Sequence, residues 1–167
     1  MSMPYQQRLI PHQVGSDGIV ANNGKHYWLT PPDIYEKLDA EFHFDFDPCP
    51  HPRPLWDGLE VEWGQSNYIN PPFSGPTKWV NKAIAEYRKG KKVVFVFPID
   101  KWVHKMIAVA SEIRNLDDIR WLSIEDQQPG PGTGRHVACF VLDPHKSVPF
   151  DAENATGGSL DTPPIKN

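Results

Sequence analysis

Apolar positions along the chain recur with two periods, which predict a folded body between about residues 25 and 145. Helical spacing of the apolar residues predicts helices over 30–42, 77–89 and 101–113. Runs rich in β-branched and aromatic residues predict strands over 42–48, 67–70, 91–98, 119–124 and 135–143. Because helices separate most of these strands, we predict an α/β fold with a mostly parallel sheet, helices on its faces and a closing antiparallel strand.

The first predicted helix has a clear start in "TPPDIYEKLDAEF". Thr30 is expected to be the N-cap, Pro31 suits the first helical position, and Asp33 stands where a capping box places its acidic partner. The next stretch, "FHFDFDP", predicts a short strand with its three phenylalanines on one face. "KKVVFVFP" is apolar on both faces, as expected of a central parallel strand.

The two ends of the chain differ in composition from this body. Residues 1–24 are polar and rich in glycine and asparagine, and they predict a flexible arm. Residues 146–167 contain turn formers without apolar periodicity, and they predict a disordered tail. Residues 25–145 are therefore expected to form a single domain, which suits a length of 167 residues.

Composition narrows the class of protein. The chain has 39% hydrophobic and 23% charged residues, which is ordinary for a globular protein, and its two cysteines indicate no disulfide framework. No apolar run approaches the ~20 residues of a membrane span, and no signal peptide is recognisable, so we expect a cytoplasmic monomer. A net charge of −4 argues against bulk electrostatic binding of DNA, but it leaves room for an enzyme with one local basic patch.

The stretch "SNYINPPFSG" is the strongest chemical signal. Pro71 and Pro72 donate no backbone hydrogen bonds, and they push Asn70 into an extended conformation. The result is a stiff corner at the end of a strand that presents the Asn70 amide, bare carbonyls and the Phe73 ring. Because ligands bind beyond the carboxyl ends of strands in open α/β sheets, we expect the site here.

The chemistry of this corner suits a planar amino group conjugated to a ring or carbonyl. Such a nitrogen is a poor nucleophile because its lone pair is delocalised. Two acceptors, the Asn70 side-chain oxygen and the Pro71 carbonyl, would draw that lone pair back onto nitrogen. Phe73 would stack on the flat substrate and hold it for attack on an electrophile.

Several blocks of the chain resemble the small phage-type DNA N6-adenine methyltransferases. "NPPF" is similar to motif IV of amino-methyltransferases, in which Asp, Asn or Ser precedes Pro-Pro and an aromatic residue. The blocks occur in the same order over roughly residues 26–143, and they read "HYWLTPPDIYEKLDAEFHFDFDPCP", "LEVEWGQSNYINPPFSGPTKWVNKA", "VVFVFP" and "GRHVACFVL". The resemblance implies a reduced Rossmann-like fold that depends on S-adenosylmethionine, encoded by a phage or prophage.

The resemblance also implies roles for individual residues. The implied catalytic residues are Asn70, Pro71, Pro72 and Phe73. The implied cofactor-binding residues are Trp28, Thr30, Pro31, Asp47, Pro48, Cys49 and Asn70. The chain departs from the family pattern in "DPCPHP", where small residues are usual, and in Phe73, where tyrosine is commoner. It also lacks a glycine-rich cofactor loop.

Double-stranded DNA is the partner that this resemblance implies. The target adenine must leave the base stack, which costs a few kcal/mol, and contacts to flanking groups must compensate. The residues proposed for these contacts are Ser74, Lys78, Lys101, Arg135 and His136, with Lys82 and Lys105 as further candidates. The glycine-rich loop over 125–134 is expected to contribute to the DNA surface, because long loops in compact domains are often functional.

Other interpretations remain open on sequence alone. RNA bases and protein glutamine amides also present planar amino groups, and a methyltransferase fold can serve as a non-catalytic binding module. Structural roles are possible for Asp47 as a turn cap, for Trp28 in the core and for Thr30 as a helix cap. A metal site is not expected, because Cys49 and His51 lack zinc spacing with further ligands.

Overall fold

The computed structural model describes residues 28–124 and 126–149, so the predicted arm and most of the predicted tail lie outside the described residues. The described residues form α1 (Pro32–Phe42), β1 (Ser66–Ile69), α2 (Pro76–Arg88), β2 (Lys92–Pro98), α3 (Val103–Ile107), β3 (Glu112–Asn115) and β4 (Val137–Leu142). Among them, no helix has the length and apolar character that a bilayer span requires.

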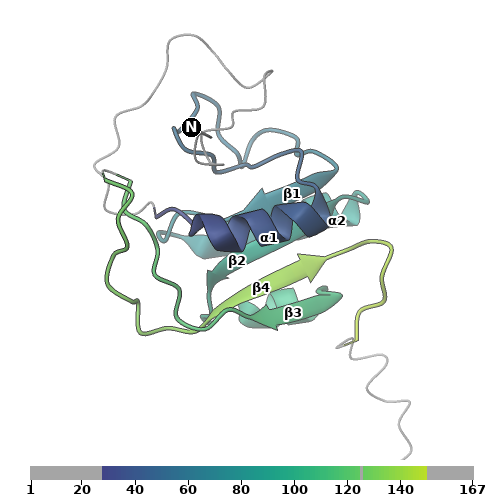
Figure 1. The fold of residues 1–167 in the computed structure, drawn as a ribbon. Coiled ribbons are helices and arrows are strands. Elements are labelled where there is room, and N and C mark those ends of the chain that lie inside the picture. Colours follow the sequence, from purple (N-terminus) through teal and green to yellow (C-terminus); the bar gives the residue numbers. More distant parts are fainter. Residues whose placement is uncertain (1–27, 125, 150–167) are drawn as a thin grey trace, which may run out of the picture.

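The four strands form one mixed sheet in the order β1-β2-β4-β3 (Figure 1). β1 and β2 are parallel, whereas β4 is antiparallel to both of its neighbours, β2 and β3. β1, β2 and β3 therefore run in one direction, and the expected closing antiparallel strand is inserted between two of them. Because it does not add to an edge, the four strands of the described residues contain one parallel pair, and the prediction of a mostly parallel sheet is wrong.

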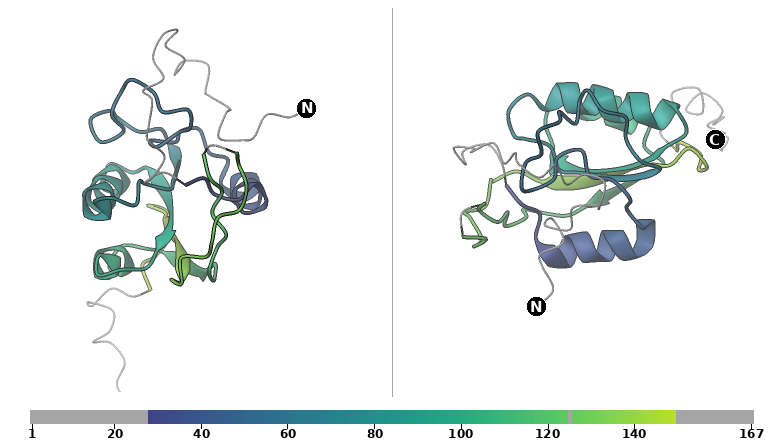
Figure 2. Two further views of the ribbon diagram at one scale, coloured as in Figure 1. Left: turned by 90° about the vertical axis from the view of Figure 1, so that its left-hand side faces the viewer. Right: turned by 90° about the horizontal axis from the view of Figure 1, so that it is seen from above.

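Helices cover both faces of the sheet, with α1 on one side and α2 and α3 on the other (Figure 2). Successive side chains of β2 enter opposite clusters of buried residues. Phe95 and Phe97 pack with the α2–α3 side, and Val94 and Val96 pack with the α1 side. All four side chains are buried, so the prediction of a central strand that is apolar on both faces is confirmed.

The start of α1 differs from the expectation. Pro31 has an extended backbone (φ −54°, ψ 136°) and is itself the N-cap, so Pro32 is the first helical residue. The reason is local, because a residue that precedes proline avoids the helical region. Thr30 is therefore not the N-cap residue. Its buried hydroxyl instead hydrogen-bonds the hydroxyl of Tyr68 in β1.

The predicted strand over 42–48 is reduced to a single bridge. Phe42 ends α1, His43 adopts a left-handed conformation (φ 51°), and Phe46 makes an isolated parallel bridge to Asn67 of β1. Phe42 and Phe44 pack on the α1 side of the sheet, whereas Phe46 packs on the α2 side. The alternation had suggested that the three phenylalanines share one face of a strand, and this prediction is wrong.

The chain between β2 and β4 also differs from the prediction. The helix predicted over 101–113 ends at Ile107, and its last part is the edge strand β3. Ile113 stands opposite Phe140 in the ladder with β4, so pairing with a distant strand overrides the local helical spacing. The strand predicted over 119–124 does not form, and Leu122 makes isolated bridges only.

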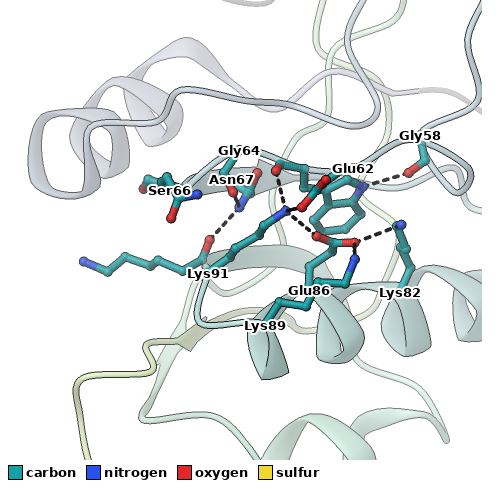
Figure 3. Close-up of polar contacts among 12 residues, drawn as sticks. Gly58, Glu62, Gly64, Ser66, Asn67, Lys82, Glu86, Lys89 and Lys91 are labelled. Atoms are coloured by element: carbon teal, nitrogen blue, oxygen red, sulfur yellow. Dashed lines mark hydrogen bonds and ion pairs between the residues drawn. The ribbon is translucent and has the colours of Figure 1, made fainter.

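A buried ionic cluster joins the end of α2 to the residue before β2 (Figure 3). The Glu86 side chain is fully buried, and its carboxylate accepts hydrogen bonds from Lys91 at 2.7 Å and Lys89 at 2.9 Å, with Lys82 also at 2.9 Å. Lys91 Nζ also donates to the Trp63 carbonyl at 2.6 Å. Burial alone would raise the pKa of Glu86, but the lysine contacts lower it to about 2.

Replacement of Glu86 by glutamine should destabilise the fold, because Lys91 is then left buried with an incomplete set of partners. We expect Glu86→Gln to lower the free energy of unfolding at pH 7 by about 3 kcal/mol, measured by denaturant titration. The carboxylate stabilises the fold above its unfolded pKa of 4.5, and this contribution is lost as the pH falls toward about 2. The difference between wild type and variant should therefore shrink below pH 4.5.

The matched control is Glu62→Gln, which removes the other carboxylate partner of Lys91. The Glu62 side chain is 75% exposed. Its replacement leaves the buried ammonium group of Lys91 paired with Glu86, so the cost should be small. We expect this variant to unfold close to wild type. Equal destabilisation by both substitutions would contradict a special role for the buried carboxylate.

Candidate active site

Three chain segments meet at the carboxyl ends of β1 and β2. Residues 70–75 follow β1, residues 99–102 follow β2, and residues 135–136 precede the antiparallel strand β4. The backbone N–H of Ile99 donates to the His136 carbonyl at 2.9 Å and ties two of these segments together. The "NPPF" corner therefore follows the carboxyl end of a strand, as the sequence predicted.

Asn70 is held in one orientation at this edge. Its side chain is largely buried, with 8% of the residue exposed, and its Nδ2 donates to the Trp28 carbonyl at 2.7 Å. Its Oδ1 is buried and has no hydrogen-bond partner among the described residues. A buried acceptor without a donor costs roughly 1–3 kcal/mol, so this oxygen is poised to accept a hydrogen bond from a ligand.

The Phe73 ring is fixed by two edge-to-face contacts. Its centroid lies 5.1 Å from that of Phe97 and 5.6 Å from that of Trp121, with the ring planes 84° and 85° apart. Phe73 is half-buried, whereas Pro71 and Pro72 are buried. The ring is thus rigidly placed beside Asn70, which suits a stacking partner.

Tyr68, which the sequence analysis did not select, contacts a residue of the predicted cofactor site. It is completely buried, and its hydroxyl pairs with that of Thr30. Burial raises the pKa of Tyr68 well above its usual range, and the nearby charge of Asp47 adds to this effect. Period-two alternation could have indicated it, because Tyr68 precedes Asn70 by two residues, and side chains two residues apart in an extended chain point to the same side.

Asp47 lies in the loop that follows the Phe46 bridge. Burial raises the pKa of Asp47 to about 7, although the backbone N–H of Cys49 donates to Oδ1 at 2.8 Å and opposes this rise. Pro48, Cys49 and Pro72 line one small cavity of about 30 Å³. The structure therefore brings the "DPC" and "NPPF" segments together.

The same cavity is also lined by residues that the sequence analysis did not select, among them Trp56, Asp57, Gly58 and Trp79. Gly58 lies directly against the loop, because a Cβ at this position would be 2.0 Å from the Pro48 carbonyl oxygen. No local pattern marks this contact. Within residues 28–124 and 126–149, no group of three His, Cys, Asp or Glu side chains could hold a metal.

The residues proposed for DNA contacts separate into two groups. The exposed group borders the strand ends and comprises Ser74, Lys78, Lys101, Arg135 and His136. Arg135 is 61% exposed and lies 3.5 Å from Asp100. The other two candidates have partners elsewhere, because Lys82 contacts Glu86 and Lys105 donates to Asn81 at 2.9 Å.

The loop before Arg135 is anchored by hydrogen bonds. The Asp118 carboxylate accepts from the backbone N–H of Thr133 at 3.1 Å and of Gly134 at 3.2 Å. Gly134 has φ 66°, a left-handed conformation that favours glycine. These contacts fix the backbone immediately before Arg135.

One comparison with known proteins identifies a related family. The family described as DNA N-6-adenine-methyltransferase (Dam) matches residues 19–146, which is most of the chain. The comparison with curated proteins gives no match. The family match confirms the resemblance drawn from the order of the sequence blocks.

The raised pKa of Asp47 predicts a specific dependence of stability on pH. The folded state favours the protonated carboxyl, so its contribution is complete below the ordinary value of 3.8 and declines as the pH rises to about 7. Asp47→Asn should remove this decline, as measured by unfolding of the ligand-free protein from pH 4 to pH 8. Asp33→Asn, which changes an exposed aspartate of α1, is the control and should follow wild type. An unchanged profile for Asp47→Asn would contradict the assignment.

Proposed function

The chain belongs to the DNA N-6-adenine-methyltransferase (Dam) family, and we propose that Asn70 and Phe73 hold a flipped adenine for methylation at N6. The chain is thus a DNA adenine N6-methyltransferase, and the proposal concerns how it works. The observation that carries it is the Asn70 side chain. Its oxygen is buried without a partner among the described residues, while its nitrogen is committed to the Trp28 carbonyl.

This arrangement suits the activation of an adenine amino group. The Asn70 oxygen accepts one N6–H bond, and the Pro71 carbonyl is proposed to accept the other. Both bonds draw the ring-delocalised lone pair back to nitrogen, which makes it a better nucleophile. Because Nδ2 is already bonded, the amide does not turn to present a donor to the substrate, and no strong general base is required before transfer.

Phe73 is proposed to stack on the flipped base. Its edge-to-face contacts with Phe97 and Trp121 hold the ring in place before the base arrives, so stacking orders no further side chain. Correct placement of the two reacting atoms is itself a large part of catalysis. The base must first leave the duplex, and this step is included in the proposal.

The proposed methyl donor is S-adenosylmethionine, which when bound supplies an electrophilic methyl group on a sulfonium. The residues proposed to hold it are Trp28, Thr30, Pro31, Asp47, Pro48, Cys49 and Asn70. The surroundings of Asp47 fit such a ligand. A carboxyl with a pKa of about 7 becomes ionised when ammonium or hydroxyl donors lie against it, and the cofactor carries both.

DNA is proposed to bind along the edge formed by the carboxyl ends of β1 and β2. The residues proposed for contacts are the exposed Ser74, Lys78, Lys101, Arg135 and His136. Local cations are needed there because the chain as a whole carries a net charge of −4. Lys82 and Lys105 are left out of this surface, since their ammonium groups have partners elsewhere.

We further propose a reduced Rossmann-like arrangement, supported by the common direction of β1, β2 and β3 and the inserted antiparallel β4. Residues 25–145 are proposed as the catalytic domain, with residues 1–24 as an arm and 146–167 as a tail. A monomeric, cytoplasmic enzyme of phage or prophage origin also stays a proposal.

The central test is methyl transfer by an Asn70→Ala variant. Protein, labelled S-adenosylmethionine and mixed duplex DNA are incubated, and N6-methyladenine is measured by mass spectrometry of the digested DNA. We expect the variant to lose about 100-fold in rate, because it lacks an interaction made to the developing charge. Asn81→Ala, which changes an exposed asparagine of α2, should keep wild-type activity.

Other outcomes of this experiment separate the alternatives. Wild-type protein that binds the cofactor but methylates RNA or glutamine peptides in place of DNA would overturn the substrate assignment. Failure to bind the cofactor would favour the binding module. Equal activity of wild type and Asn70→Ala would remove the proposed role of the amide.

Phe73 provides a second test of the same site. Phe73→Tyr keeps the aromatic face and should retain activity within a few-fold. Phe73→Leu keeps the apolar bulk but loses base stacking, which is worth roughly 1–3 kcal/mol, so we expect a loss of about 10-fold or more in kcat/KM for DNA. Similar activity of the leucine and tyrosine variants would show that stacking is not used.

A further inference from the structure

We infer that residues 121–123 and 128–130, called the clamp below, position both Asn70 and Phe73 for the reaction. Trp121 and Gly130 are the positioning residues. The inference rests on the proposed function, because it assigns the clamp a role in placing the groups that hold adenine. In Figure 2, the segment between β3 and β4 that contains the clamp lies on the same face of the sheet as α1.

The clamp pairs with the segment that enters α1. Leu122 and Leu29 form an antiparallel bridge in which each backbone N–H donates to the other carbonyl at 2.9 Å. Leu122 also bridges Pro129, and the N–H of Gly130 donates to the Trp121 carbonyl at 2.8 Å. Three short segments therefore lie side by side, with the middle one bonded to both of its neighbours.

One side of the clamp determines where Trp28 lies. A Cβ at Gly130 would be 2.6 Å from Cζ3 and 3.0 Å from Cη2 of Trp28, so the indole packs directly against the Gly130 backbone. The carbonyl of Trp28 in turn accepts the 2.7 Å hydrogen bond from Asn70. The distance between Gly130 and Trp28 thus influences which way the Asn70 oxygen faces.

The other side of the clamp contacts Phe73. The Trp121 indole is 1% exposed and meets the Phe73 ring edge to face at 5.6 Å. Because the Trp121 carbonyl also accepts the Gly130 N–H, one backbone hydrogen bond joins the contact to Phe73 with the contact to Trp28. Asn70 and Phe73 are therefore braced by the same pair of residues.

Position 130 requires glycine because the Trp28 ring occupies the place of a side chain, and not because of the backbone conformation. Its φ lies outside the left-handed region, so an alanine there would adopt the same backbone without strain. Gln128 and Pro129 are exposed, so this segment buries little apolar surface of its own. What it contributes is a close contact with Trp28, and this points to positioning and not to core stability.

The test is a cycle of three variants, Gly130→Ala, Trp28→Phe and the double variant. The added methyl group must displace the Trp28 ring, and we expect Gly130→Ala to lower kcat for DNA methylation by about 10-fold or more. Phenylalanine lacks Cζ3 and Cη2 and leaves room for the methyl group. We therefore expect the double variant to have the same kcat as Trp28→Phe alone, a non-additive result that is expected if position 130 affects kcat through its contact with Trp28.

Gly132→Ala is the matched control from the same loop. A Cβ at Gly132 would be 2.5 Å from the Asp118 carboxylate and not near Trp28, so Trp28→Phe should not relieve any effect of this substitution. If Gly130→Ala does not fold, the inference is tested by comparing kcat of the double variant with kcat of Trp28→Phe. A kcat equal to that of Trp28→Phe supports the inference, and a clearly lower kcat overturns it.

The failure of this inference can be told apart from failure of the proposed function. Wild-type kcat in Gly130→Ala, with Asn70→Ala inactive, would overturn the clamp and leave the proposed role of Asn70 intact. Full activity of Asn70→Ala would overturn both, because nothing then requires a positioned amide. A lower kcat in Gly130→Ala that the double variant relieves, together with an inactive Asn70→Ala, would support both the clamp and the proposed role of Asn70.

Discussion

A buried carbonyl oxygen without a donor is the feature on which the site depends. In Asn70, the side-chain nitrogen is bonded to the Trp28 carbonyl, and Oδ1 lacks a partner among the described residues. Such an oxygen costs free energy in the folded state, so the surrounding structure must prevent the amide from turning and the loop from opening to water. Backbone contacts around Trp28 and the two adjacent prolines serve this purpose.

A buried ionic cluster lies at the opposite end of α2 from the site. Glu86 and Lys91 form a buried ion pair where α2 ends and β2 is about to begin, whereas α2 begins immediately after the "NPPF" corner. The helix therefore connects a rigid ionic anchor at one end of the sheet with the site at the other. The ionic contacts thus stabilise the end of the sheet that lies away from the site. The site end contains the unpaired Asn70 oxygen and the half-buried Phe73 ring.

Local patterns in the sequence predicted those parts that depend on neighbouring residues. β2 followed from its apolar run, α2 from its helical spacing, and the corner from the prolines after Asn70. The failures came from distant contacts. The strand predicted over 119–124 is replaced by the pairing of Leu122 with Leu29, and β3 forms because β4 offers it a partner. Equally, no local signal places Gly130 against Trp28, about 100 residues away in the chain.

The most direct measurement compares binding of two DNAs by wild type and Asn70→Ala. One DNA contains adenine and the other contains purine, which lacks the 6-amino group. If Asn70 Oδ1 accepts the amino hydrogen, wild type prefers adenine over purine more strongly than the variant does, by about 5-fold or more in Kd. The same preference in both proteins would contradict a hydrogen bond between Asn70 and the adenine amino group.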